Sequence, residues 1–474
     1  TNKSRVFYEL LIIIQTFVQF VDVTNEILFI GKMVILLISV AISLYNFIDK
    51  TRSKSGLFQA CAKSTASSEQ INECIWLFRW EKGGEMSVSK RAVKANAYKL
   101  KGSLKKCGYD RWRYYFNGVN AASGEERLFF IELMSVNPAV SFENTVLAQS
   151  ESEFGSLREG DLQAALAGNI EVKASPAKNV IPSYACVRAG VFGSRPKQLN
   201  RFFANSEFVC QKRVFGVKAG GCAFSDNELY GALSVTEIES RSFKEWKSAA
   251  GRMEWNLKYE RDFDAPEINS KEGKNWLCGG LTARFSGMVS LDGQEYAVSP
   301  DHSFGYIDKS WGTSMGAPCM RIASGRLTSI FTGRVMKDSA FALSGDFDGR
   351  LCALAKFEND FYSFGPKQKI KSYKAHWSCA RVPEGEKSEE LHWSASVHCK
   401  KYILDADVFC PASEMLVKDY FAPDGSLLKV LCGGSGSGEI RLYKQIKKAL
   451  ELIQHAKILN ASCEYGQIDG QEGE

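Results

Sequence analysis

Histidine and cysteine residues in the carboxyl-terminal third are the first candidates for chemistry, because imidazoles and thiolates bind transition metals. His392 and His398 would share one face of an alternating strand, and Cys399 follows them directly. His376 and Cys379 lie upstream. No carboxylate or closely spaced pair completes this set, and the sequence contains no Cys-x-x-Cys pair. We therefore interpret these residues as the polar face of a strand and expect no metal site.

A glycine-rich run at residues 433–438 could in principle surround a phosphate group. Phosphate is usually held at the amino terminus of a helix, and this run precedes a predicted strand. The sequence also lacks a Walker loop and a His-Glu-x-x-His motif. We interpret the run as a tight bend that enters the last strand of the β-rich region, and we expect no nucleotide cofactor.

Residues 305–312 place an acid and an amine side by side among aromatic residues: Tyr306, Asp308, Lys309 and Trp311. Neighbouring side chains of an extended strand point to opposite faces, so Asp308 and Lys309 would line one pocket only if a bulge intervened. A lysine beside the carboxyl group would also lower its pKa. These two points favour a structural ion pair, with Trp311 packed at a strand corner.

The overall composition argues against nucleic-acid binding and against a disulfide scaffold. Lys and Arg number 60 and Asp and Glu 54, and the two signs are mixed along the chain, so no basic stripe is formed. The 14 cysteines are scattered singly, which is typical of reduced thiols buried as small hydrophobic residues. This cysteine usage favours the cytoplasmic side of a membrane.

The amino-terminal region contains two apolar runs, at residues 6–21 and 27–48. The second has the length that crosses a bilayer, and the first is marginally short. Lys3 and Arg5 precede the runs, and Lys50 and Arg52 follow them, which predicts a transmembrane helical hairpin at residues 1–54 with both ends in the cytoplasm. The alternative is a cytoplasmic protein, if the amino end is misassigned. Residues 55–75 have the polar, small-residue composition of a linker.

The remaining sequence predicts a mainly β protein. Residues 111–118 and 127–134 form a predicted hairpin, and alternation predicts strands at 253–259, 282–289, 339–344 and 402–408. Asp-Gly pairs at 292–293, 348–349 and 424–425 are typical of hairpin turns between such strands. A polar stretch at residues 261–274 divides this region into two antiparallel halves, 76–270 and 271–445, each a barrel or a sandwich.

Two helices complete the prediction. One, at residues 156–167, lies in a polar insertion near residues 150–178 of the first half. The other is an amphipathic helix at residues 445–459, with Ile446, Leu450, Ile453 and Ile458 on one side. We therefore expect residues 446–474 to form a carboxyl-terminal helix and tail.

Three segments resemble the tocopherol cyclase family. Residues 109–116, Tyr-Asp-Arg-Trp-Arg-Tyr-Tyr-Phe, with the strand at 128–133, are similar to the family's aromatic opening strands. Residues 305–312, Gly-Tyr-Ile-Asp-Lys-Ser-Trp-Gly, with Pro318 beyond them, are similar to its Tyr-x-Glu-Lys-Asn-Trp-Gly…Pro segment. Residues 434–443 are similar to its glycine turn and closing strand. The resemblance implies two lipocalin-like β-barrels, related to those of carotenoid hydratases.

The resemblance also implies a chemistry, in which a buried acid protonates an isoprenoid alkene and aromatic faces stabilise the cation. Asp308 stands at the position of the family's glutamate and would be the acid, with Lys309 holding it in place. The implied substrate-binding residues are Trp112, Tyr114, Tyr306 and Trp311. The shorter aspartate, and Ser310 in place of the family's asparagine, depart from the pattern.

Three functions follow as hypotheses. The first is a membrane-anchored enzyme without a cofactor that cyclises or hydrates an isoprenoid or another apolar, lipid-like substrate. The second is a non-catalytic lipocalin-like protein that carries an apolar small molecule or lipid, for which the same apolar pocket would serve. The third is a purely structural membrane-associated protein. The sequence defines neither the substrate nor the oligomeric state.

Overall fold

The computed structural model describes residues 95–140, 181–211, 215–237, 248–261, 268–269, 273–301, 304–346, 350–365, 373–384 and 388–468. These residues belong to one compact unit, Val88–Glu474. The predicted membrane hairpin at 1–54, the linker at 55–75 and the helix at 156–167 lie outside the described residues. Within the described residues, no helix has both the length and the apolar character needed to cross a bilayer.

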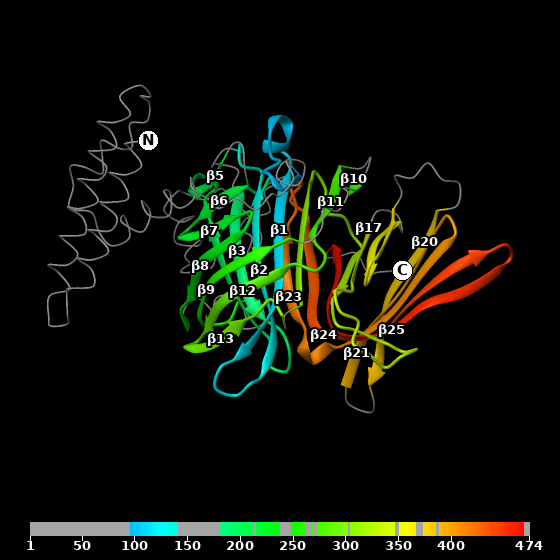
Figure 1. Ribbon diagram of the computed structural model, residues 1–474. Helices are drawn as coiled ribbons and strands as arrows, with labels where there is room; N and C mark the ends of the chain where they lie inside the picture. Colours follow the sequence, from blue (N-terminus) through cyan, green and yellow to red (C-terminus); the bar gives the residue numbers. More distant parts are fainter. Residues whose placement is uncertain are drawn as a thin grey trace, which may run out of the picture. The chain divides into compact units, whose positions relative to one another are not determined.

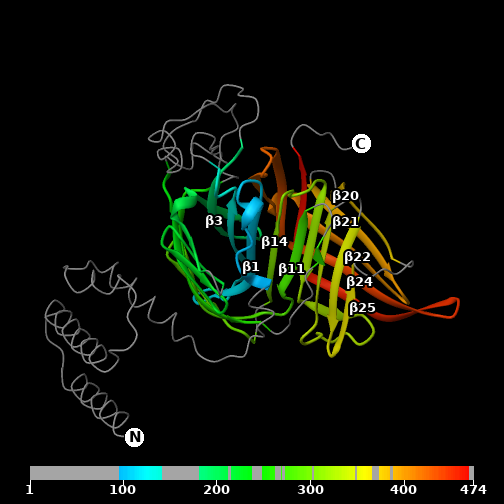
Figure 2. The same ribbon diagram turned by 90° about the horizontal axis from the view of Figure 1, so that it is seen from above.

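The described chain is mainly β and forms two antiparallel sheets (Figure 1). The first sheet curls around its own core and is nearly closed (Figure 2). Its order is β10-β11-β14-β1-β13-β12-β9-β8-β7-β6-β5, and β2, β3 and β4 continue from β1. The strands are β1 (Tyr109–Asn120), β2 (Glu126–Val136), β3 (Tyr184–Val191), β4 (Lys197–Phe203), β5 (Phe208–Cys210), β6 (Gly216–Ala219), β7 (Cys222–Ser225), β8 (Glu228–Val235), β9 (Gly251–Glu260), β10 (Ile268–Asn269), β11 (Lys274–Gly280), β12 (Arg284–Leu291), β13 (Gln294–Val298) and β14 (Gly305–Gly312).

The second sheet has the order β19-β18-β17-β15-β25-β24-β22-β21-β20, with β16 paired to β25 and β23 paired to β24. Its strands are β15 (Cys319–Ser324), β16 (Leu327–Ser329), β17 (Ala340–Asp346), β18 (Arg350–Phe357), β19 (Asp360–Phe364), β20 (Lys374–Glu384), β21 (Ser388–Cys399), β22 (Tyr402–Pro411), β23 (Leu416–Phe421), β24 (Leu427–Ile446) and β25 (Ala449–Ile468). Short 3-10 helices lie at η1 (Gly102–Lys105), η3 (Asn205–Glu207) and η4 (Ala412–Glu414).

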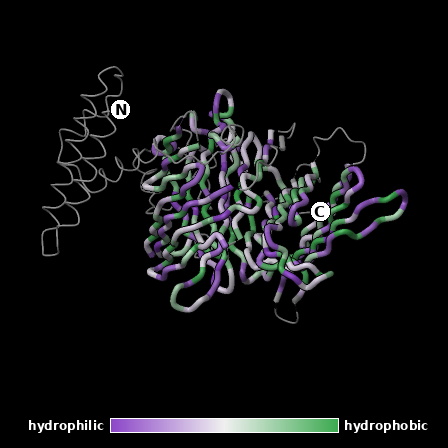
Figure 3. The backbone as a smooth tube through the Cα atoms, viewed as in Figure 1, coloured by the Kyte–Doolittle hydropathy of each residue, from purple (hydrophilic) through white to green (hydrophobic). Residues whose placement is uncertain are grey.

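The strands predicted from alternation are confirmed. The hairpin at 111–118 and 127–134 corresponds to β1 and β2, and the other four predicted strands correspond to β9, β12, β17 and β22. The Asp292-Gly293 turn joins β12 to β13, and both of its residues have a positive φ. Along β9 every second residue is buried, because one face packs on the core and the other is exposed. Hydrophobic and hydrophilic residues accordingly alternate along many of the strands (Figure 3).

The prediction of a carboxyl-terminal helix at residues 445–459 is wrong. These residues end β24, turn at Lys447 and begin β25, which pairs with β24, β15 and β16. Ile458 is buried and its neighbours Lys457 and Leu459 are exposed, which is the period of a strand. The apolar residues satisfied a helical spacing as well, but the backbone hydrogen bonds to strands distant in sequence decide the outcome.

The boundary between the two sheets also differs from the predicted one. It falls between Gly312 and Cys319, so β11 to β14, which the sequence analysis placed in the second half, pair within the first sheet. The polar stretch that suggested a boundary near residue 270 is instead followed by β11, which pairs directly with β14.

β1 and β14 are buried on both faces, unlike β9. One face of each strand packs into the core inside the first sheet, which contains Trp112, Tyr114 and Ile307. The other face packs into a second core that includes residues of both sheets, among them Tyr306 and Tyr420. These two central strands therefore place side chains between the sheets, and the candidate site lies there.

The glycine run at residues 433–438, predicted as a bend before the last strand, lies inside β24, whose pairing with β25 shifts in register there. Replacing Gly438 with alanine tests this irregular pairing. Gly438 has a φ of +158°, and a Cβ atom there would lie 1.9 Å from the carbonyl oxygen of Asp407. We expect Gly438→Ala to lower the free energy of unfolding by about 2 kcal/mol or more. Gly124→Ala is the control, because its φ of +73° is strained in the same sense and no atom lies within 4 Å. Urea unfolding followed by circular dichroism should show the smaller loss for the control; equal losses would contradict the steric explanation.

Candidate functional site

Successive side chains of β14 point to opposite faces of the strand. Asp308 and Lys309, which are neighbours in the sequence, are therefore separated. Tyr306 belongs to the core between the sheets, and Asp308 hydrogen-bonds to its hydroxyl on that side. Ile307 belongs to the core inside the first sheet, and Lys309 lies over Trp112 of that same core. Asp308 and Lys309 therefore face opposite sides of the strand, as expected from the strand period.

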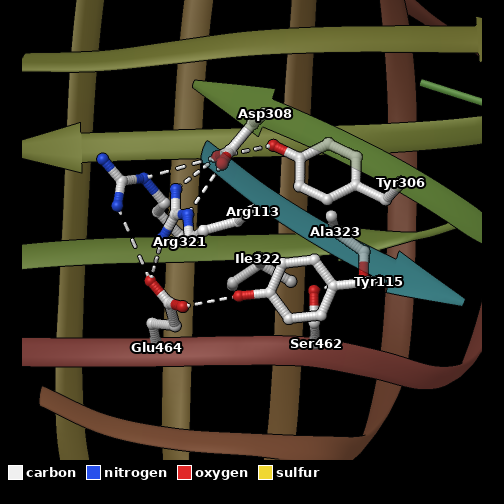
Figure 4. Close-up of a pocket in the computed structure, with 9 residues that line it drawn as sticks. All are labelled: Arg113, Tyr115, Tyr306, Asp308, Arg321, Ile322, Ala323, Ser462 and Glu464. Atoms are coloured by element: carbon white, nitrogen blue, oxygen red, sulfur yellow. Dashed lines mark hydrogen bonds and ion pairs between the residues drawn. The ribbon is translucent and has the colours of Figure 1, made fainter. Parts of the chain in front are cut away.

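Asp308 is completely buried and binds Arg113, its cross-strand partner on β1. Arg113 Nε donates to Asp308 Oδ1 at 2.7 Å, and Arg113 Nη2 donates to Oδ2, which makes the ion pair bidentate. The indole of Trp276 on β11 and the hydroxyl of Tyr306 donate to the same Oδ2 at 3.0 and 3.1 Å. Arg321 on β15 lies 3.8 Å away (Figure 4). Every strong polar neighbour of this carboxyl group is a donor.

Arg113 also binds a carboxylate of the second sheet. Its Nη1 donates to Glu464 Oε2 on β25 at 2.5 Å, and Tyr115 donates to Glu464 Oε1 at 2.7 Å (Figure 4). Arg321 lies 3.6 Å from Glu464 Oε2. One guanidinium group thus joins a carboxylate of β14 to a carboxylate of β25, and so joins the two sheets.

The charges of this cluster follow from its hydrogen bonds. Burial by itself would raise the pKa of Asp308, but Arg113 and then Arg321 outweigh it, and the pKa lies below its usual value. The pKa of Glu464 is lowered in the same way, against its burial, by Arg113 and Arg321. Burial, followed by the neighbouring carboxylates, raises the pKa values of Tyr306 and Tyr115 well above normal. Both carboxyl groups are therefore ionised at neutral pH, and both phenols are protonated.

A small cavity opens among these side chains. It is lined by Arg113, Tyr115, Tyr306, Asp308, Arg321, Ile322, Ala323, Ser462 and Glu464 (Figure 4). The cavity has a volume of about 10 Å³, which is room for about one water molecule. Two ionised carboxylates, two phenols and two guanidinium groups face this space, with apolar atoms on the side of β15. Such a set can accept a proton, donate one and stabilise an oxyanion.

Lys309 does not hold Asp308 in place. Its ammonium group lies 3.1 Å from Asp110 Oδ1, donates to the carbonyl oxygens of Asn96 and Ala97 at 3.1 and 2.7 Å, and lies 4.0 Å from the centre of the Trp112 ring. Burial lowers the pKa of Lys309 to about 8. Its partners show that Lys309 ties residues 96–97 to the first sheet, on the opposite side of β14 from the cavity.

Three of the predicted substrate-binding aromatic residues also lie away from the cavity. Trp112 packs against Phe215, with ring centres 5.1 Å apart, and Tyr114 packs against Tyr259 at 5.7 Å, both inside the first sheet. Trp311 belongs to a small cluster with Ala95 and Leu277. Of the four predicted aromatic residues, Tyr306 is the one that lines the cavity.

Sequence reasoning did not select Arg113, Tyr115, Arg321 or Glu464. The first two carried a signal, because arginine and aromatic residues alternate along the predicted strand at residues 111–118. Glu464 carried none, because it lies in the tail that was expected to follow the helix at residues 445–459. The histidine set on β21 also has other partners: His392 lies 3.3 Å from Asp407 and stacks on Phe409, and His398 contacts the carbonyl oxygen of Lys400.

An absence of the Gly-x-Ser-x-Gly elbow of hydrolases was expected from the sequence, but residues 312–316 do have that spacing. They leave β14 and lead into β15, whereas the elbow joins a strand to a helix. The Ser314 hydroxyl accepts a hydrogen bond from the amide of Gly316. This segment is therefore a turn between the two sheets.

No known family and no curated protein sequence matches this chain. Among solved structures it is similar to an AttH-type protein from Nitrosomonas europaea, with a TM-score of 0.39 and 9% identity over 78% of this chain and 97% of that one. It is also similar to kievitone hydratase from Nectria haematococca, with a TM-score of 0.35 and 10% identity over 79% and 94% of the two chains. The resemblance to the tocopherol cyclase family rests on the sequence segments alone.

Removing Arg113 should destabilise the protein strongly. Arg113→Met leaves the buried Asp308 and Glu464 without their shared counter-charge, and we expect a loss of about 3–5 kcal/mol in the free energy of unfolding. Adding Asp308→Asn and Glu464→Gln to this variant should restore part of the loss, because neutral amides cost less to bury. Arg252→Met is the control, since Arg252 is 63% exposed in its ion pair. Equal urea midpoints for the Arg113 and Arg252 variants would contradict a bridging role.

Stability should also fall in acid because of these two groups. The folded-state pKa values of Asp308 and Glu464 lie below their unfolded values. Their contribution is therefore complete above the unfolded pKa of about 4 and is lost as the pH falls through the folded-state values. Thermal unfolding from pH 6 downward should show a shallower decline for Glu464→Gln than for the unmodified protein. Parallel curves would mean that Glu464 is not ionised in the folded state.

Proposed function

We propose that the protein brings a double bond of an apolar, isoprenoid-like or lipid-like molecule up to the cavity between its sheets and adds to it the water molecule for which the cavity has room. The observation that carries this proposal is the pairing of Asp308 with Tyr306 and of Glu464 with Tyr115 around a space for about one water molecule. Each pair offers a proton acceptor beside a proton donor, which is what addition of water requires.

The ionisation of the cluster favours a base-assisted route over direct protonation of an alkene by Asp308. A carboxylate held by Arg113 has no proton to give, so Asp308 or Glu464 would accept a proton from the cavity water as its oxygen bonds to the substrate carbon. The electron pair of the double bond would move to a carbonyl oxygen conjugated with it, beside Arg321. A phenol would then protonate the neighbouring carbon, and the carboxylate would return its proton to the phenolate. The net change is the addition of one water molecule.

Cyclisation of the substrate is an alternative reaction at the same site. In that reaction an oxygen atom of the substrate, in place of water, would add to the double bond. A third candidate is non-catalytic binding of the same class of molecule. It is favoured by one observation: all three side-chain nitrogens of Arg113 are used in ion pairs, with Asp308 of the same sheet and with Glu464 of the other sheet. A proposed membrane location through residues 1–54 would bring either activity close to a lipid pool.

Incubation of the full-length protein with an apolar lipid extract in ¹⁸O-labelled water separates these functions. Hydration should yield products heavier by one labelled water molecule in mass spectrometry, cyclisation should change retention time without changing mass, and binding alone should return the ligand unchanged. We expect Tyr306→Phe or Asp308→Asn to lower turnover by about 100-fold or more.

Tyr420→Phe is the matched control. It removes a buried phenol that donates to another carboxylate, Glu132, at 2.8 Å, and Tyr420 does not line the cavity. Its turnover should stay within a few-fold of the unmodified protein. Labelled product formed at the same rate by Tyr306→Phe and Tyr420→Phe would dismiss the cavity as the reacting centre.

A further inference from the structure

The hairpin formed by β24 and β25 extends beyond the strands that flank it. Each of its two strands has 20 residues. On the outer side of β25, β15 pairs with residues 462–466 and β16 pairs with residues 456–458, so neither of these strands reaches residues 449–454. The end of the hairpin accordingly projects away from the rest of the second sheet in both views (Figure 1 and Figure 2).

The tip of this hairpin presents apolar side chains to solvent. Residues 445–451 are all exposed, and among them Ile446 is 44% and Leu450 is 56% exposed. The pairing of β24 with β25 places Ile446 opposite Ala449, and it places Leu450 opposite Gln445. Because successive residues of a strand point to opposite faces, Ile446 and Leu450 lie on different faces of the hairpin. Each face of the tip therefore carries an exposed apolar side chain.

The charge of the tip is positive. Its turn consists of two exposed lysines, Lys447 and Lys448. Lys444 on β24 lies opposite Glu451 on β25, so the one carboxylate of residues 444–451 has a lysine as its cross-strand neighbour. The two lysines of the turn lie beyond this pair, at the end of the hairpin.

A second turn adds to this positive charge. Lys400 and Lys401 are exposed between β21 and β22, and the amide of Gln445 donates to the carbonyl oxygen of Lys401 at 2.6 Å, so the two turns are neighbours. Residues 400–401 and 444–451 together contain five lysines and one glutamate, a net charge of +4, whereas the whole chain has a formal net charge of +6. Positive charge is therefore concentrated at this end of the second sheet.

This combination of lysines and exposed apolar side chains fits the surface of a membrane that contains anionic lipid. Anionic head groups attract lysines, and apolar side chains at the same tip can enter the boundary between head groups and acyl chains. Nucleic acid would pair with the lysines and leave Ile446 and Leu450 exposed. Lysine is depleted from protein interfaces, and charged side chains on an exposed edge strand oppose pairing with a second copy.

We infer that the tip of the β24–β25 hairpin docks on a membrane surface that contains anionic phospholipid, with Ile446 and Leu450 inserted among the head groups and the lysines of the two turns bound to the lipid anions. This inference goes beyond the proposed function and does not depend on it. Glu451 at the tip and Glu464 at the cavity are separated by roughly 40 Å along β25, at the rise of an extended strand. The tip and the cavity are therefore separate sites.

Binding of the full-length protein to vesicles tests the inference. One set of vesicles is phosphatidylcholine alone, and in the other a quarter of the lipid is phosphatidylserine. We expect Lys401→Glu combined with Lys448→Glu to lower binding to the phosphatidylserine vesicles by about tenfold or more in co-sedimentation, because two attractive charges become repulsive. Neither residue has a positive φ, so both turns should keep their conformation.

Lys105→Glu combined with Lys106→Glu is the matched control. It makes the same change of charge at exposed lysines in and beside η1, where no large apolar side chain is exposed. Its binding should stay within about twofold of that of the unmodified protein, since the two regions are more than a Debye length apart in sequence-distant elements and act separately. Equal losses for the two charge variants would overturn the inference by showing attraction through net charge alone. Unchanged binding of both variants would also overturn it.

Hydrogen exchange at the tip provides a readout that a membrane anchor elsewhere in the chain does not change. The amides of residues 445–451 should exchange about fivefold more slowly, or slower still, on phosphatidylserine vesicles than on phosphatidylcholine vesicles. Ile446→Ser combined with Leu450→Ser should abolish this protection without changing the charge. Protection that develops without vesicles as the protein concentration rises would identify a second copy as the occupant and overturn the inference. Equal protection by a DNA oligonucleotide would overturn it as well.

Discussion

One buried guanidinium group binds a carboxylate of each of the two sheets. Arg113 binds Asp308 of the first sheet and Glu464 of the second, and all three side chains are almost entirely shielded from water. An ion network of this kind is tolerable only when each charge is hydrogen-bonded, since the cost of removing it from water is several kcal/mol per ion. Trp276, Tyr306 and Tyr115 supply the remaining donors. The geometry of the interface, and with it the cavity, depends on this network.

The same network decides the protonation states of the site. A carboxyl group buried among apolar side chains would become a proton donor, but a carboxyl group that faces a guanidinium group becomes a base. Asp308 belongs to the second case, and the protonated groups beside the cavity are the phenols of Tyr306 and Tyr115. The chemistry that such a site supports differs from the direct acid catalysis that its sequence position suggested.

The placement of this polar cluster is unusual for the fold around it. The core inside the first sheet is mainly apolar and aromatic, with the Lys309–Asp110 ion pair beside Trp112, while the core between the sheets contains the joined charges of Arg113, Asp308, Arg321 and Glu464 as well as apolar residues. Apolar residues of the same volume would cost less to bury. Sites that depart from the packing rules of their own fold are candidates for function, and here the departure coincides with the cavity.

Several features of this protein were determined by its sequence alone. Alternation and Asp-Gly turns predicted the β1–β2 hairpin and the strands β9, β12, β17 and β22, because the period of two is a local property of an extended chain. The same period assigned Asp308 and Lys309 to opposite faces of one strand, which their contacts confirm.

The tertiary structure decided the rest. The apolar residues of 445–459 have a helical spacing, and pairing with β16 and β24 selects the strand. The sequence also could not supply the partners of Asp308. Arg113 lies opposite it because β1 and β14 pair in one particular register, and Glu464 of β25 lies beside Arg113 because the second sheet packs on the first. Register and sheet packing are set by contacts between residues far apart in the chain, and a single sequence contains no record of those distances.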